Sequence, residues 1–545
     1  MARPSLYKLS GTRTQRDEPL GTSLYLINPV ADMPSYFSSE VFAARGLSPA
    51  IATADLAIAT VAALAPDDFA IRLCDENVSP VDYDTDADFI GITGKVSQWG
   101  RMRSIADEFR ARGKTVVIGG PYASLSPEVV RPHCDILIRG EMEEIAPKIF
   151  SDLRSGDWDD EYVGTRPDLR TSPIPRWDLY PNDRAIMGTV QTSRGCPFEC
   201  EFCDVIEYLG RKQRHKPVDQ VIAELDQLYR LGYRTAFLAD DNFTVYRARA
   251  KDLLAAIRDW NARQTAGRFR FTTQVSIDAA GDEELLRACA DAGLTHVFIG
   301  IETPNEASLR EAKKRQNLKK NLLEEIQRFV DFGISVDCGM IVGFDGDDVS
   351  IFARQYEFAM ATAVPIFSLG TLVAPAATPL HARLAKEGRL VKDGSEIAAG
   401  PWTTNIIPKL MTREQLYEGV KWLCNSLYRP EAFEARVTRL IETFGRRYQP
   451  AHALEPQTVE ARAINADSAS LIHRMSRMGG AERKMLASIL KLFPTNPAVS
   501  QHVMGTLFMY YQIRYMYEHG SFWEPMLAAD AGTGWQRQRE VAVPA

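Results

Sequence analysis

Short apolar runs alternate with helical segments along most of this chain, and this alternation constrains the fold more than any other feature. Gly, Pro or Asp bounds each run of the first series, as is usual for buried strands. These predicted strands are residues 23–29, 70–76, 88–94, 114–121 and 134–141. Helices are predicted among them at 50–64 and 102–112. The pattern predicts a parallel doubly wound, Rossmann-like sheet, which binds ligands in the loops after its strands, here 28–40, 94–99 and 119–124.

A second series of strands and helices covers residues 188–399. Its predicted strands are residues 188–195, 235–242, 268–278, 296–303, 336–344 and 367–375. Its predicted helices are residues 218–231, 247–260, 283–292, 318–332 and 349–362. Six strand–helix units predict a (β/α)6 partial barrel, with its site at the carboxyl ends of the strands.

The other segments have a different character. Residues 1–21 are polar and predicted to be flexible, and residues 156–187 are acidic, contain prolines and are predicted to link a first domain, 22–155, to the barrel. Strand signals end near residue 400, so 400–530 is predicted to be a helical domain, followed by a mobile tail over 531–545. The predicted helices of that domain are residues 412–428, 431–444, 481–492 and 498–517. The expected fold class is therefore α/β with a helical C-terminal region.

The composition excludes several classes of protein. Hydrophobic residues make up 45% and charged residues 25%, as in ordinary globular proteins. A net charge of −7 argues against a nucleic-acid partner. Eight cysteines are too few for a disulfide-built secreted scaffold, and the N-terminal residues lack the apolar stretch of a signal peptide. The long uncharged run 358–380 contains prolines that break it, so we expect no transmembrane segment and a cytoplasmic protein.

Three of the cysteines lie close together, in SRGCPFECEFCD. Cys196, Cys200 and Cys203 have the spacing C-x3-C-x2-C directly after a predicted strand. Thiolates are soft ligands that hold iron–sulfur clusters or zinc. Three of them on one loop can bind three irons of a 4Fe–4S cube and leave the fourth iron open to a small substrate. The alternative is a structural zinc site, which needs four protein ligands, and His215 could be the fourth.

This cysteine motif after the first strand of a six-unit barrel resembles the radical S-adenosylmethionine (SAM) enzymes, and the aromatic Phe202 before the last cysteine also fits their pattern. The resemblance implies that the three cysteines ligate a 4Fe–4S cluster. It also implies that SAM chelates the open iron through its amino and carboxylate groups. Reductive cleavage of SAM would then yield a 5′-deoxyadenosyl radical.

Further barrel motifs are similar to the SAM site of this family. LADDN (238–242) ends the second strand, where an acidic pair suits the ammonium of SAM; the alternative is that the pair caps the following helix. GIETPNE (300–306) and GMIVGFDGD (339–347) end the fourth and fifth strands. The residues expected to contact SAM are Phe202, Asp240, Asp241, Gln274, Ser276, Glu302 and Gly343.

The doubly wound domain resembles the cobalamin-binding domain of a large radical SAM subclass, on the segments GGPYASLSPE (119–128) and RGEMEE (139–144). The residues that this resemblance places at cobalamin are Lys95, Ser97, Gln98, Trp99, Gly119, Gly120, Tyr122, Ser124, Ser126, Gly140 and Glu141. The Asp-x-His-x-x-Gly pattern that supplies a histidine to cobalt elsewhere is absent, and no histidine precedes His133. We therefore expect no imidazole from this loop on cobalt.

Within the subclass, RGCPFECEFCDVIEYLGRKQRHKP followed by FLADDNF resembles the group that contains hopanoid C-2 methylase. The implied function is a cobalamin-dependent C-methyltransferase that moves a methyl group from SAM, through methylcobalamin, to a small-molecule, lipid or peptide substrate. The resemblance also implies an electron donor such as flavodoxin or ferredoxin. Two alternatives stay open: cyclisation or rearrangement without net methylation, and a zinc-stabilised cobalamin-binding regulatory module.

Two expectations concern the arrangement of these parts, and two sequence runs each keep two interpretations. The carboxyl edges of sheet and barrel should face each other across one cavity, because the methyl group must reach a substrate radical. The helical region after residue 400 should close that cavity. The basic run 211–216 is either a solvated face or an anion site, and the Met- and aromatic-rich run 504–517 is either packed core or pocket lining.

Overall fold

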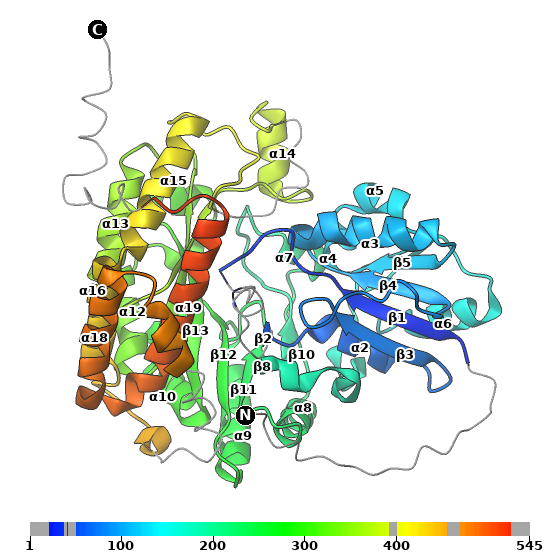
Figure 1. Ribbon diagram of the computed structural model, residues 1–545, viewed down its shortest axis with the longest axis horizontal. Helices are drawn as coiled ribbons and strands as arrows, with labels where there is room; N and C mark the ends of the chain where they lie inside the picture. Colours follow the sequence, from blue (N-terminus) through cyan, green and yellow to red (C-terminus); the bar gives the residue numbers. More distant parts are fainter. Residues whose placement is uncertain (1–20, 37–40, 42–50, 392–400, 455–468, 525–545) are drawn as a thin grey trace.

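The computed structural model describes residues 21–36, 41, 51–391, 401–454 and 469–524. Two parallel sheets lie side by side, one in the N-terminal part of the chain and one in a curled half-barrel, with helices against the barrel on its far side (Figure 1). This arrangement confirms the predicted α/β fold class. Almost all of the predicted flexible N-terminus, and the whole predicted tail, lie outside the described residues.

The first sheet has the strand order β3-β1-β4-β5-β6-β7, and all its neighbouring strands are parallel. Its strands are β1 (Ser23–Asn28), β3 (Ala70–Asp75), β4 (Phe89–Thr93), β5 (Thr115–Gly119), β6 (Ile136–Arg139) and β7 (Glu161–Val163). Its helices are α2 (Leu56–Leu64), α3 (Trp99–Ala111), α4 (Pro121–Leu125), α5 (Pro127–Val130) and α6 (Ala146–Ser155). The order reverses between β1 and β4, and a doubly wound sheet binds its ligands beyond the strand ends near such a reversal.

The second sheet has the parallel order β15-β14-β13-β12-β11-β8-β2. Its main strands are β8 (Ala185–Val190), β11 (Thr235–Leu238), β12 (Arg270–Val275), β13 (Leu294–Glu302), β14 (Ser335–Val342) and β15 (Phe367–Thr371). Its helices are α7 (Val205–Tyr208), α8 (Val218–Arg230), α9 (Arg247–Ala262), α10 (Glu283–Ala292), α11 (Glu306–Glu311), α12 (Leu322–Asp331), α13 (Ile351–Ala361) and α14 (Pro379–Lys386). The six predicted barrel strands are confirmed.

Two short edge strands depart from the expected course of the chain. The helix expected over 50–64 begins only at Leu56; Ile51–Thr53 instead forms β2, which pairs with β8 and so joins the barrel sheet. The segment expected as a linker contains β7, which extends the first sheet beyond β6. It also contains Trp177, which is fully buried. The chain between the two sheets therefore takes part in the core.

The helical prediction after residue 400 is confirmed for the described residues. The helices are α15 (Arg413–Tyr428), α16 (Pro430–Thr443), α18 (Gly480–Leu492) and α19 (Ser500–His519). Thr412 starts α15 with a reciprocal capping box to Gln415, which satisfies the first free amides of that helix. The Tyr428 hydroxyl bonds the backbone N and O of Phe367, at 2.9 and 2.7 Å, and so fastens α15 to β15.

The carboxylate of Asp55 gives the fold a testable pH dependence. It caps α2 by accepting from the backbone N of Ile58 at 3.0 Å. Burial, with Asp75 nearby, raises the pKa of Asp55 to about 6, although the Ile58 amide and Lys95 lower it. Because the folded-state pKa is raised, the carboxyl stabilises the fold while protonated, and this contribution is lost as the pH rises through about 4 to 6.

Asp55→Asn keeps a capping side chain and removes this titration. Between about pH 4 and 7, the free energy of unfolding of the variant should rise relative to that of the wild type by roughly 1–3 kcal/mol. Denaturant unfolding at a series of pH values measures this difference. A difference that stays constant with pH would mean that Asp55 does not titrate in this window.

Candidate functional site

The three cysteines lie on one loop, between the two short strands β9 (Ser193–Arg194) and β10 (Arg214–His215), which pair antiparallel. Gly195 opens the loop at φ +94°, where a Cβ would meet the backbone oxygens of Lys212 and Gly210. The Gly195 amide donates to Asp241 at 2.8 Å. Turn geometry and this one carboxylate therefore fix the start of the loop.

Electrostatic interactions link the three thiols. Cys196 and Cys203 each interact with Cys200, which is buried. Burial raises the pKa of the Cys196 thiol to about 11 and that of Cys203 to about 12, and Lys314 lowers both. Thiolates here need a positive partner, which an iron–sulfur cluster would supply. The donor set, three thiols on one loop beside an open cavity, fits a cluster with one open iron.

Charged contacts hold this loop from outside. Glu201, between two of the cysteines, is buried, accepts from Arg383 of α14 at 2.9 Å, and bonds the backbone of Ala312 and Leu380. Arg383 also pairs with Glu311 and Asp345, at 3.2 and 2.8 Å. The cluster loop is thus tied to elements that follow β13, β14 and β15.

The zinc alternative would need His215 as its fourth ligand, and the structure gives this side chain other contacts. His215 packs edge-on against Tyr246, and burial and Arg249 lower its pKa. In the described part of the chain, no three His, Cys, Asp or Glu side chains stand close enough to hold a metal ion. Cysteines that bind different corners of a cube stand farther apart than ligands of one zinc ion, so this result is compatible with a cluster.

The acidic pair after β11 has two separate tasks. Asp240 is buried and accepts from the backbone N of Thr192 and Ser193, at 2.7 and 3.0 Å, and from their hydroxyls. Asp241 holds the cluster loop through Gly195. The alternative of a helix cap is wrong, because α9 begins at Arg247 with Tyr246 before it. Since Asp240 is committed to the end of β8, Asp241 is the better candidate to face a ligand ammonium.

Glu302 ends β13 in a left-handed conformation, φ 64°, and lines the cavity described below. A non-glycine residue held there stores strain that is common at functional sites. Lys314 pairs with Glu302 at 2.6 Å and interacts with Cys200 and Cys203, while Gln316 donates to Cys200 at 3.7 Å. Lys314 and Gln316 carry no local sequence signal for this role, because only the turn after α11 brings them to the cysteines.

The other residues expected at SAM are spread around the barrel rim. Phe202 lines the cavity and packs edge-on against Phe344, with centroids 6.1 Å apart. Gly343 has φ +114°, but its Cβ position faces Leu416 and Ile406, so the structure does not open it toward a ligand. Ser276 is buried against Asn242, and Gln274 is exposed at the end of β12. A role for these residues at SAM stays a prediction.

The residues expected at cobalamin divide into two sets. Tyr122 and Ser126 line the cavity, and Lys95 lowers the pKa of the cavity residue Asp204. Gly120 has φ +93°, where a Cβ would strike the Thr93 hydroxyl at 2.3 Å. These positions, on the loops after β4 and β5, remain candidates for the cofactor.

The residues of the second set make hydrogen bonds and packing contacts within the protein. The Gln98 amide donates to Asn28 and Pro29, the Ser97 carbonyl accepts from Asp32, and Trp99 is buried against Tyr122 and His133. Ser124 accepts from the Gly140 amide at 2.9 Å and donates to Gly120, which joins the loops after β5 and β6. Gly119 packs against Ile138, and Gly140, at φ +76°, faces the Gly164 carbonyl. Trp99 is therefore core, and its expected place beneath the corrin is not supported.

Glu141 belongs to a buried group of charges that we call the interdomain clamp: Glu141, Glu143, Arg194 and Arg214. Glu141 accepts from Arg194 at 2.6 Å and from both terminal nitrogens of Arg214, at 2.9 and 2.6 Å. Glu143 pairs with Arg194 at 2.7 Å. The clamp joins the loop after β6 to the β9–β10 pair that carries the cysteines. The basic run 211–216 was predicted to be either a solvated face or an anion site. Both interpretations are wrong for Arg214, which is buried against Glu141, and for Lys216, which is buried against Glu224 at 2.6 Å.

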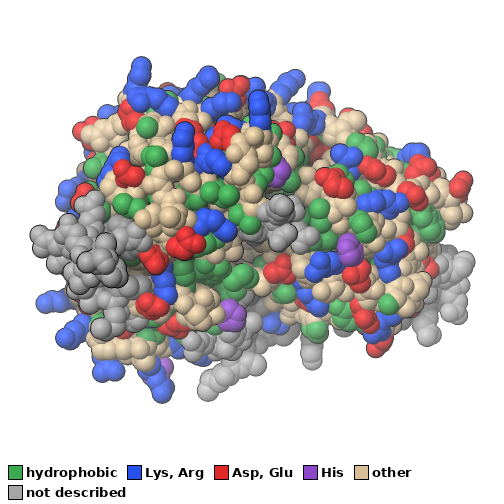
Figure 2. All heavy atoms as spheres, turned by 90° about the horizontal axis from the view of Figure 1, so that it is seen from above, with side chains coloured by type: hydrophobic (Ala, Val, Ile, Leu, Met, Phe, Trp, Pro, Cys, Tyr) green, Lys and Arg blue, Asp and Glu red, His purple; other side chains and the backbone are tan. Residues whose placement is uncertain are grey.

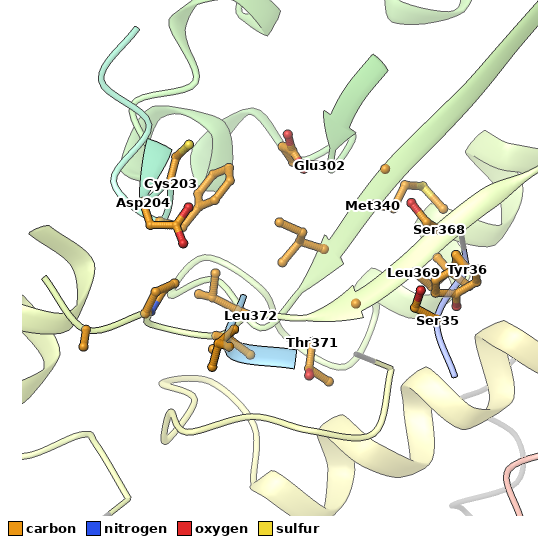
Figure 3. Close-up of a pocket in the computed structure, with 18 of the residues that line it drawn as sticks. Ser35, Tyr36, Cys203, Asp204, Glu302, Met340, Ser368, Leu369, Thr371 and Leu372 are labelled. Atoms are coloured by element: carbon orange, nitrogen blue, oxygen red, sulfur yellow. The ribbon is translucent and has the colours of Figure 1, made fainter. Parts of the chain in front are cut away.

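One cavity of about 500 Å³ connects these parts. Cys203 and Asp204 lie at one end, and Ser35, Tyr36 and Ser368 at the other (Figure 3). Each loop where a ligand was expected contributes to the lining, through Tyr36, Val96 and Tyr122. The expectation that sheet and barrel edges share one cavity is therefore confirmed.

The C-terminal helices were expected to close the cavity, but other elements form its wall. Among the described residues, those after 400 do not line the cavity. The β15 end and the chain before α14 wall it instead, through Thr371, Leu372 and Pro375.

The surface contains no dominant basic region on the face shown in Figure 2, where acidic and basic side chains are interspersed. Among the described helices, none is long and apolar enough to cross a membrane.

Family models and curated relatives match most of this chain. The radical SAM superfamily model matches residues 190–359, and a domain of unknown function (DUF4070) matches residues 378–519. An uncharacterized methyltransferase of Synechocystis is 34% identical, covering 82% of this chain and 83% of its own. Hopanoid C-2 methylase of Rhodopseudomonas palustris is 30% identical, covering 73% and 74%.

The fold also matches a solved structure, the cobalamin-dependent SAM radical enzyme OxsB with aqua-cobalamin and SAM bound. The TM-score is 0.59 at 14% identity, covering 96% of this chain and 82% of that one. The cysteine loop and the extended sequence similarity agree with each other, and the chain belongs to the radical SAM methyltransferases, in the group that contains hopanoid C-2 methylase.

Proposed function

We propose that this enzyme transfers a methyl group from SAM, by way of methylcobalamin, to a carbon atom of an apolar substrate. The observation that carries the proposal is the single cavity shared by Cys203, by Tyr122 and Ser126 of the N-terminal sheet, and by the barrel strands. The reaction needs all three parts within reach of one substrate.

The three cofactors of the family, a 4Fe–4S cluster, SAM and cobalamin, have candidate positions around this cavity. Cys196, Cys200 and Cys203 would hold the cluster, Glu302 and Asp241 would accept from polar groups of SAM, and Tyr122 would face cobalamin. Bound there, the cofactors supply a hydrogen-abstracting radical and a transferable methyl group. The chain would orient them, and Phe202, packed on the buried Phe344, gives the cysteine loop an apolar side. Reduction of the cluster would come from a donor such as flavodoxin or ferredoxin.

The end of the cavity farthest from Cys203 favours an apolar acceptor. Tyr36, Met340 and Leu369 line it, together with the small hydroxyls of Ser35 and Ser368, and the hydroxyl of Tyr36 is already bonded to Tyr517. Such a wall binds a hydrocarbon skeleton by burial and has few groups to orient a charged one. A hopanoid, named for the relative from R. palustris, is therefore the first acceptor to test.

The test is anaerobic turnover of the reconstituted full-length enzyme with methyl-labelled SAM, a reductant and a hopanoid, with a lipid extract and an aqueous extract in parallel. We expect the label in a lipid product, with 5′-deoxyadenosine formed at the same time. Deoxyadenosine formed together with an altered but unlabelled substrate would refute methyl transfer and favour rearrangement. Label in the aqueous fraction alone would refute the apolar acceptor.

A further inference from the structure

We propose that the C-terminal helices, which match the domain of unknown function, set the substrate end of the cavity by holding the residues that follow β1. This role presupposes the proposed function, because it concerns the same cavity. Three residues of that segment, Ser35, Tyr36 and Val41, form hydrogen bonds with α19, and we call these three the strap. Ser35 and Tyr36 line the cavity at the end opposite Cys203 (Figure 3).

Gln512 of α19 holds the strap by its backbone. Its amide nitrogen donates to the Ser35 carbonyl at 3.1 Å, and its amide oxygen accepts from the Val41 backbone N at 3.2 Å. Gln512 is fully buried in the middle of an otherwise apolar helix face. A buried amide is costly unless its groups are bonded, so these two contacts explain why a glutamine stands there.

Tyr517, about one and a half turns farther along α19, holds the strap by a side chain. Its hydroxyl lies 2.7 Å from the hydroxyl of Tyr36, and the two rings meet edge-on with centroids 6.2 Å apart. Cys424 of α15 lies 4.0 Å from the Tyr36 hydroxyl. Because Tyr36 lines the cavity and Tyr517 is fully buried behind it, the position of α19 decides where this wall stands.

The same helices also hold the facing wall. Residues 368–371 of β15 line the cavity, and the Tyr428 hydroxyl bonds the backbone of Phe367, directly before them. Asn425, also on α15, bonds Phe522 and Glu524 just after α19, which fixes the two helices to each other. One helical unit thus sets the spacing between the strap and β15 without lining the cavity itself.

A displaced strap should therefore misplace the substrate while leaving the cluster and SAM in place. The experiment compares full-length Tyr517→Phe, Tyr36→Phe and the double variant, with Gln512→Leu as a second way to release the strap. Tyr515→Phe is the matched control on the same helix, since that ring stacks on His519 and does not meet the strap. The readouts are iron content, SAM cleavage, and deoxyadenosine released per methyl transferred to the lipid fraction.

We expect each single tyrosine variant to raise deoxyadenosine per transferred methyl roughly fivefold, the change that corresponds to one buried hydrogen bond. The double variant should be no worse than either single variant, because both remove the same contact. Iron content and SAM cleavage should match the wild type. Ratios that stay at the wild-type value, or losses of iron equal to the losses of methylation, would overturn the role of the strap.

The two proposals can fail separately. If the wild type transfers no methyl group, the proposed function fails, and hydrogen exchange at the Val41 amide then decides on the strap. Faster exchange in Gln512→Leu than in Tyr515→Phe, with SAM cleavage retained, would support the strap contact. Equal exchange would refute it.

Discussion

Replacement of Cys196, Cys200 or Cys203 by Ala is expected to reduce cluster iron to near zero and to abolish reductive SAM cleavage. Each thiolate would bind a different iron, so the loss of one corner would leave the cube without a stable anchor. The fold should survive, since Asp240, Asp241 and Glu201 hold the loop without the metal. Iron and sulfide analysis after anaerobic reconstitution, with deoxyadenosine assays, measures both effects.

Cys289→Ala is the matched control. This cysteine is buried on α10, away from the loop, so its replacement removes a thiol of equal size and leaves the cluster unaffected. The three loop variants should be equivalent, because cluster assembly needs all three ligands. A loop variant that cleaves SAM at the wild-type rate would show that its cysteine is not a ligand.

The architecture was largely predictable because most strands carry their own signal. Runs of apolar residues bounded by Gly, Pro or Asp predicted the strands of both sheets except β2 and β7. Each of these two strands has three residues and lies at the edge of a sheet. A segment so short has no measurable period, and only its partner strand makes it a strand. The pairing of β2 with β8 is therefore a tertiary effect that local sequence does not contain.

The residues of the candidate site also differ in whether local sequence predicts them. The cysteine spacing is local, so the loop could be predicted, whereas Lys314 and Tyr36 reach the site from distant parts of the chain. Glu141 shows the opposite error: a motif resemblance places it at cobalamin, but two arginines occupy its carboxylate. Charge pairing of this kind depends on packing, because long side chains at the end of a strand can turn toward either neighbour.

We expect a substitution in the interdomain clamp to have the largest effect on the free energy of unfolding. The side chains of Glu141, Arg194 and Arg214 are 7–11% exposed, so removal of the shared carboxylate leaves a buried guanidinium without its partner. Glu141→Ala should therefore lower the free energy of unfolding by about 3–5 kcal/mol. It should also weaken cluster retention, because Arg194 and Arg214 lie on the two strands that flank the cysteine loop. Denaturant unfolding and iron content after gel filtration measure the two effects.

The pair Arg139–Glu161 supplies the control, with the same chemistry in the same domain. Its atoms are 2.9 Å apart but its side chains are 37% and 39% exposed, so Glu161→Ala should cost at most about 1 kcal/mol. Adding Arg214→Met to Glu141→Ala should recover part of the loss, because the unpaired charge is then gone and Glu143 still holds Arg194. If Glu141→Ala costs no more than Glu161→Ala, the clamp does not hold the two domains together, and the orientation of the N-terminal sheet must depend on β2 and the apolar contacts around Trp177.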